Sequence, residues 1–78
     1  MKLYFFDIRD GEDLIPDEVG VELPDINAVK TEAALSLADI TRTDFIGQPF
    51  RHMAIEVRDD DGPVLEATFH WKLRLIRH

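Results

Sequence analysis

The spacing of hydrophobic residues along this chain of 78 residues changes twice, from every second position to helical spacing and back. Residues 3–9 are rich in aromatic and branched side chains, and hydrophobic and polar residues alternate in residues 19–23, 53–57 and 65–73. Alternation places successive side chains on opposite faces of a β-strand. These patterns predict four strands, two before and two after a central helical segment.

The helical segment has a start signal and a stop signal. Asp25 follows a proline and suits the N-cap position, where a carboxylate accepts from free backbone N–H groups. Gly47 and Pro49 are typical of a helix end. We therefore predict a helix from residue 26 to about residue 45. Its apolar stripe consists of Ile26, Val29, Ala33, Leu37 and Ile40.

The connections between these segments are short and rich in turn residues. Asp10-Gly11 and Pro16-Asp17 predict turns, and Leu14-Ile15 between them suits a short return segment. The sequence DDDGP at residues 59–63 predicts the turn between the last two strands. The order is therefore β-β-α-β-β. We predict a single α+β domain spanning residues 1–78, a mostly antiparallel four-stranded sheet with one helix packed on one face.

Composition narrows the classes of function. The formal net charge is -7, with eleven acidic and four basic side chains in residues 1–50 and five of each in residues 51–78. An acidic surface repels phosphate, which disfavours nucleic acid as a partner. The absence of cysteine excludes disulfides and thiolate zinc sites. A chain this short buries little surface, so a partner chain would add stability.

We assign no targeting signal and no binding site to either end of the chain. The first apolar run stops at Asp7, too short for a signal-peptide core or a membrane span. We expect a cytoplasmic protein with no membrane contact. The basic end at Lys72, Arg74 and Arg77 has too few cations for a nucleic-acid site, and such charges protect an edge strand from aggregation.

Catalytic motifs are absent from the sequence. Acidic residues fall in turns or at positions predicted to face solvent, and Val57 stands where a calcium loop ending at Gly62 needs an aspartate. Ser36 lies in the predicted helix without a glycine-flanked elbow, and the four glycines form no phosphate-binding loop. We predict no enzyme, no catalytic residue and no cofactor.

Two histidines raise the question of a metal site. His52 and His70 lie on the last two predicted strands and can be neighbours across their hairpin. Glu56 or Glu66 would then supply a third ligand. The alternative interpretation treats both as ordinary surface residues, and we assign no metal ligand.

Nearly the whole chain resembles a known family, and the first thirty residues carry the most specific motifs. The stretches YFFDIRDG and IPDEVGVELPD, followed by an alanine-rich helix, are similar to short proteins, mostly from rhizobia and related alpha-proteobacteria, that are classed as a domain of unknown function. The matching positions are Tyr4, Phe5, Arg9, Asp10, Gly11, Gly20, Leu23 and Asp25. The resemblance implies a small cytoplasmic bacterial protein and no catalytic residue. Residues 16–40 also resemble HicB-type antitoxins in their strand, Pro-Asp element and helix.

One surface is predicted to interact with protein. A single helix covers one sheet face, which leaves Leu3 and Phe5 on the other face with little in this chain to cover them. Leu35 lies on the helix side opposite the apolar stripe. We predict that these three residues contact a protein partner, first of all a second copy in a homodimer. The alternative is a HicB-like antitoxin or regulatory module that neutralises a basic partner.

Overall fold

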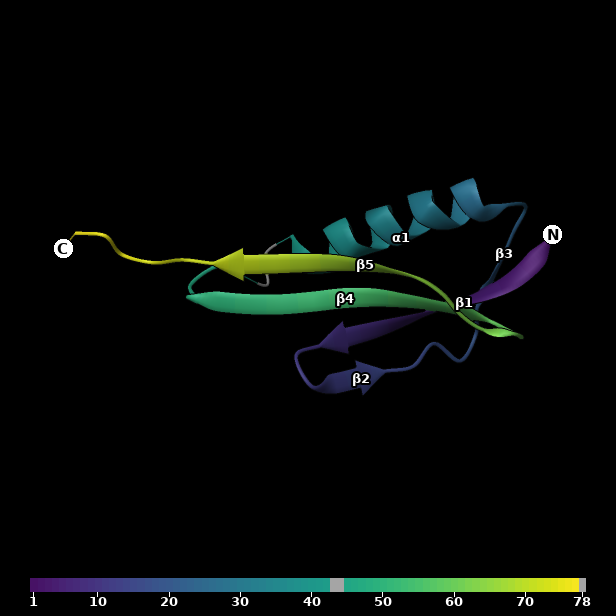
Figure 1. The fold of residues 1–78 in the computed structure, drawn as a ribbon, viewed down its shortest axis with the longest axis horizontal. Coiled ribbons are helices and arrows are strands. Elements are labelled where there is room, and N and C mark those ends of the chain that lie inside the picture. The colour runs from purple at the N-terminus through teal and green to yellow at the C-terminus, as the bar shows by residue number, and fades with distance from the viewer. Residues whose placement is uncertain (43–44, 78) are drawn as a thin grey trace.

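The computed structural model describes residues 1–42 and 45–77, which form a twisted antiparallel sheet with a helix packed along it (Figure 1). The elements along the chain are β1 (Lys2–Asp10), β2 (Asp13–Ile15), β3 (Val21–Leu23), α1 (Ile26–Thr41), β4 (Phe50–Asp59) and β5 (Gly62–Lys72). The α+β class and the antiparallel sheet are confirmed.

The strand order is β2-β1-β4-β5, and β3 pairs with β1 on the same side as β2. The described part of the chain therefore has five strands, where the sequence predicted four. The second predicted strand, residues 19–23, shortens to β3, and the return segment at Leu14-Ile15 becomes β2. Pro16 has no backbone N–H to donate, and Gly20 adopts a positive φ of 78°. These two residues separate the short strands.

The hydrophobic core lies between α1 and the middle of the sheet. Val29, Ala33 and Leu37 of α1 are buried against Ile55 and Val57 of β4 and their neighbours. These helix positions belong to the predicted stripe, so the face that packs is largely the predicted one. Ile26, the first residue of that stripe, is instead 44% exposed. The contacts of α1 fall mainly on β4 and β5, and Figure 1 shows the helix running beside β5.

The predicted helix start is confirmed and the predicted end is wrong. The Oδ1 atom of Asp25 accepts a hydrogen bond from Ala28 N at 2.9 Å, as an N-cap does. The helix ends at Thr41 instead of near residue 45, while residues 43–44 lie outside the described residues. The buried Thr41 hydroxyl donates to the Leu37 carbonyl at 2.7 Å, one turn back, which gives this hydroxyl a hydrogen-bond partner.

The molecule is elongated, with principal extents of 53, 22 and 16 Å. Its C-terminal residues leave the end of β5 and point away from the domain (Figure 1). Across residues 1–42 and 45–77, α1 is the helix that the structure describes, and it lacks the length and the apolar character that crossing a membrane requires.

Candidate functional site

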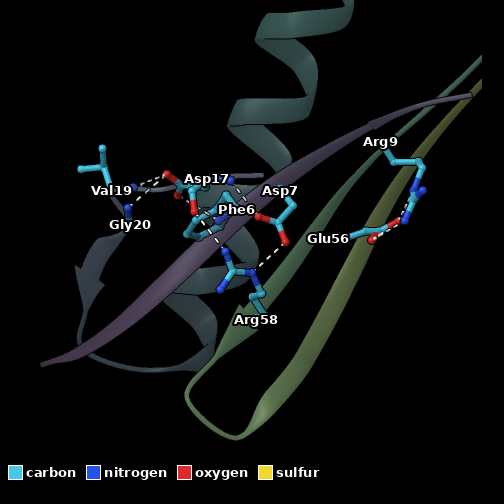
Figure 2. Close-up of polar contacts among 8 residues, drawn as sticks. All are labelled: Phe6, Asp7, Arg9, Asp17, Val19, Gly20, Glu56 and Arg58. Carbon is cyan, nitrogen blue, oxygen red and sulfur yellow. Dashed lines mark hydrogen bonds and ion pairs between the residues drawn. The ribbon is translucent and has the colours of Figure 1, made fainter. Parts of the chain in front are cut away.

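Charged side chains occupy the sheet face that lies away from α1. Alternation along the strands puts Asp7 and Arg9 of β1 on this face, beside Glu56 and Arg58 of β4 (Figure 2). The Arg9 guanidinium meets the Glu56 carboxylate through two contacts, Nε to Oε2 at 2.9 Å and a terminal nitrogen to Oε1 at 3.3 Å. A two-point contact of this kind fixes direction as well as distance. The pair therefore links β1 to β4 across the open face.

Arg58 forms a second link on the same face. Its Nε donates to Asp7 Oδ2 at 2.9 Å, and a terminal nitrogen donates to the backbone oxygen of Asp17 at 3.0 Å. Asp7 is only 7% exposed, and its other carboxylate oxygen accepts from Asp17 N at 2.8 Å. The expectation that all acidic residues face solvent or lie in turns is therefore wrong for Asp7. A buried carboxylate needs such partners, because desolvation without them is costly.

Asp17 fills the gap between β2 and β3. These two strands pair with opposite ends of β1 and leave the N–H of Phe6 without a strand opposite it in the described chain. Asp17 Oδ2 accepts from this N–H at 3.0 Å, and Oδ1 accepts from the backbone N–H groups of Val19 and Gly20 at 3.0 and 3.1 Å (Figure 2). A side-chain carboxylate thus takes the position of a backbone carbonyl.

The protonation of Asp17 reflects this environment. Burial alone would raise the pKa of the Asp17 carboxyl, but the N–H groups of Phe6, Val19 and Gly20 and the charge of Arg58 outweigh it. The net result is a pKa below the ordinary value of an aspartate. Asp17 is therefore ionised at neutral pH, and the loop at this edge depends on its charge.

Phe5 is better covered than the sequence indicated. The Arg58 guanidinium lies over the Phe5 ring, 4.5 Å from its centroid, in a cation–π contact. Gly20 passes so close that a Cβ placed on it would lie 3.0 Å from side-chain carbons of both Phe5 and Leu3. The expectation that little in this chain covers these two residues is wrong for Phe5, because Arg58 of a distant strand is its direct neighbour in register.

The three predicted interaction residues do not form one surface. Leu3 is 38% exposed beside Phe5, whereas Leu35 is 63% exposed on the outer side of α1. The strands and the helix hold these residues on different layers of the molecule. Their role in binding a partner stays a prediction.

A shallow hollow of about 450 Å³ opens where the β4–β5 ladder shifts register between Val57 and Arg58. Its polar lining consists of Asp7, Glu56, Glu66 and Arg58. Apolar side chains, including those of Val64 and Leu65, line the rest. The acidic rim of this hollow suits the charged group of a lysine or arginine side chain, and its apolar lining suits the aliphatic part of that side chain.

The two histidines lie side by side, as predicted. His52 and His70 are paired in register on β4 and β5, with ring centroids 5.8 Å apart. The Phe50 ring meets His70 edge-on at 5.3 Å. Of the third ligands considered, Glu56 is held by Arg9. No cluster of three metal-binding side chains is present among residues 1–42 and 45–77.

The two edges of the sheet differ in length. One edge consists of β2 and β3, three residues each, surrounded by acidic side chains. The other edge is β5, eleven residues long, whose only strand partner within the described chain is β4. Proteins usually shorten or cover an edge strand because its unpaired backbone groups can bind another chain. The free side of β5 is therefore a second candidate surface.

Sequence reasoning missed Asp7, Asp17 and Arg58 as a connected set. The one local signal was an aspartate at position 7 inside an otherwise apolar run. Arg58 lies 51 residues from Asp7, so the contact depends on the strand register, which alternation alone does not supply.

Most of the chain matches a known protein family. The family described as a domain of unknown function, DUF6894, matches residues 3–70. The chain belongs to this family. Residues 71–78, which include the basic C-terminal end, lie outside the match. No curated protein and no solved structure matches this DUF6894 domain.

Proposed function

We propose that this chain is a noncatalytic protein-interaction domain that associates with itself through its sheet. The observation that carries the proposal is the free side of β5, which presents eleven residues without a neighbouring strand in the described chain. An edge of that length is a ready template for another strand. Pairing with a second copy would also add buried surface to a domain of marginal size.

The chemistry of the polar face supports a structural role. The buried carboxylate of Asp7 is engaged by both Arg58 and Asp17 N, and Glu56 is engaged by Arg9. These groups bind one another and hold strands together, which differs from an acid held ready to exchange a proton with a substrate. We therefore propose that the face acts as a scaffold and that the domain is not an enzyme.

The edge of the sheet is a better contact than its face. Coverage of Phe5 by Arg58 and Gly20 leaves Leu3 as the exposed member of the predicted pair on the sheet face. The backbone N–H and C=O groups along the free side of β5 can form more contacts with a partner than this small apolar patch can.

The Tyr-Phe and Arg-Asp-Gly motifs at residues 4–11 resemble those of short proteins from rhizobia and related alpha-proteobacteria. We place the protein in the cytoplasm of such a bacterium.

Sedimentation equilibrium over a wide range of protein concentration tests self-association. The weight-average mass should rise with concentration from that of one chain toward that of two chains, because a second copy binds by mass action. A mass equal to one chain at every concentration up to the solubility limit would refute self-association.

A second candidate is binding of a basic partner, in the manner of an antitoxin or a regulatory module. The supporting observation is the hollow beside Arg58, where Glu66 forms no ion pair with any described residue. The net charge of -7 would steer a basic segment toward it. A protein that stays monomeric yet binds an arginine-rich peptide, and loses that binding in Glu66→Gln, would favour this candidate over self-association.

A further inference from the structure

The hydrogen bond between Leu73 N and Pro49 O, 2.7 Å long, fixes which backbone groups of β5 are free. In an antiparallel ladder, residues alternate between pointing their N–H and C=O toward one neighbour and toward the other. Leu73 lies opposite Pro49, so every second residue before it, back to Leu65, also points toward β4. The residues in between point outward. These are Glu66, Thr68, His70 and Lys72.

The side chains of the outward-pointing residues share one face of the sheet. Glu66, Thr68, His70 and Lys72 are all exposed, and they alternate with the core-facing side chains Leu65, Ala67 and Phe69. A strand that joins this edge would therefore meet polar side chains on the open face and apolar side chains on the helix face.

We infer that two copies of this chain pair along β5, antiparallel about a two-fold axis at Phe69, with Glu66 of each copy opposite Lys72 of the other. The inference rests on the proposed self-association and names its geometry. Outward-pointing residues must face outward-pointing residues for their hydrogen bonds to form. In this arrangement Glu66 meets Lys72 twice, Thr68 meets His70 twice, and the sheets of the two copies become one continuous sheet.

The charges select this register. Within the described chain neither Glu66 nor Lys72 forms an ion pair. The Glu66 carboxylate accepts from the Thr68 hydroxyl and lies opposite Glu56, whose charge Arg9 pairs. Lys72 of a second copy would give Glu66 an ion-pair partner of its own. Sliding the partner by two residues in one direction places His70 opposite His70. Sliding it in the other direction places Lys72 opposite Val64, and both shifts separate Glu66 from Lys72.

The opposite face of the same junction is apolar. The axis brings Phe69 opposite Phe69, Ala67 opposite Trp71 and Leu65 opposite Leu73. Leu73 is 56% exposed in the single chain, and Phe69 and Trp71 are only half-buried. Pairing would remove apolar surface of all three from water, which favours association.

Sedimentation velocity on a set of charge variants tests the inference. The two-fold axis creates two identical Glu66–Lys72 pairs in the dimer. Glu66→Lys places a cation opposite Lys72 in both pairs, and Lys72→Glu places an anion opposite Glu66 in both pairs. Each single variant should raise the dimer dissociation constant roughly fivefold or more, because every substitution counts twice across the axis. The double variant Glu66→Lys/Lys72→Glu should restore the wild-type constant to within about twofold by the same reasoning.

Two further variants are a charge control, Glu18→Lys, and a test of the backbone hydrogen bonds, Thr68→Pro. Glu18→Lys changes the net charge as Glu66→Lys does, but on the other edge of the sheet, and it should not weaken the dimer. Thr68→Pro removes an N–H that points outward and leaves the β4 ladder complete, so it should abolish dimers while the circular dichroism of the folded chain is retained.

The outcomes separate this inference from the proposed function. A wild-type dimer that the single variants weaken and the double variant restores supports both. A wild-type dimer that resists all these substitutions overturns the β5 register and leaves self-association standing. A wild-type monomer at every concentration overturns both.

Discussion

The carboxylate of Asp17 holds the outer edge of β1 where two short strands leave a gap. This carboxylate accepts from three backbone N–H groups, and the backbone oxygen of Asp17 accepts from Arg58. The Phe6 N–H has no strand opposite it in the described chain, and a polar group left unsatisfied away from water costs more than a hydrogen bond contributes. One side chain therefore fixes the path of the chain between β2 and β3.

The pKa of Asp17 predicts an acid-dependent loss of stability. Because the folded-state pKa lies below that of the unfolded chain, the unfolded state takes up a proton first as the pH falls below about 4. The stabilisation by Asp17 is complete above that pH and is lost as the pH falls through the folded-state value. Urea unfolding of the wild type between pH 5 and pH 2 should show this decline.

Asp17→Asn isolates the contribution. An amide has one acceptor oxygen, and its NH2 would face N–H donors, so the variant should unfold with about 1–2 kcal/mol less free energy at pH 7. It should also lose stability more gently on acidification than the wild type. Glu18→Gln, at an exposed neighbouring carboxylate, should match the wild type. Parallel acid curves for Asp17→Asn and the wild type would contradict the assignment.

At the scale of elements, Gly20 decides how closely the loop before β3 approaches β1. Its φ is +78°, and a Cβ there would lie 3.0 Å from the backbone oxygen of Tyr4. Gly11 also has a positive φ, of 61°, but its Cβ would meet nothing within 4 Å. Gly11→Ala should therefore cost about 1 kcal/mol of unfolding free energy and Gly20→Ala about 2–3 kcal/mol. Chemical denaturation measures both, and equal losses would show that the close approach has no energetic weight.

Local signals predicted the elements well. The N-cap at Asp25 and the apolar stripe of α1 follow from short-range chemistry, and the hairpin of β4 and β5 follows from alternation and its acidic turn. The split between β2 and β3 could not be predicted in this way. It depends on Asp17 bonding to Phe6 across the sheet, and hydrophobic periodicity contains no information on where a side chain replaces a backbone partner.

The candidate sites were harder to predict than the elements. The sequence correctly placed His52 beside His70, although the turn alone would put His52 opposite Phe69. The register shift between Val57 and Arg58 brings the two histidines together. The sequence misjudged Phe5, whose cover comes from Arg58 on a strand far along the chain. Pairing between β1 and β4 is non-local, so the polar face could be recognised only once the sheet order was known.

At the scale of the whole molecule, the sheet is asymmetric. One edge ends in short strands tied down by Asp17 and flanked by acidic residues, and the other ends in β5, long and open in the described chain. The helix contacts β4 and β5, and we propose that the outward backbone groups of β5 pair with a second copy. This asymmetry is the physical basis for proposing an interaction domain in the DUF6894 family.

Amide hydrogen exchange along β5, followed by NMR at low and high protein concentration, tests the central claim most directly. The amides of Ala67 and Phe69 bond to β4 and should exchange slowly at both concentrations. Those of Thr68 and His70 should exchange quickly in the dilute protein and slowly in the concentrated protein. Fast exchange at Thr68 and His70 at every concentration would contradict pairing along β5.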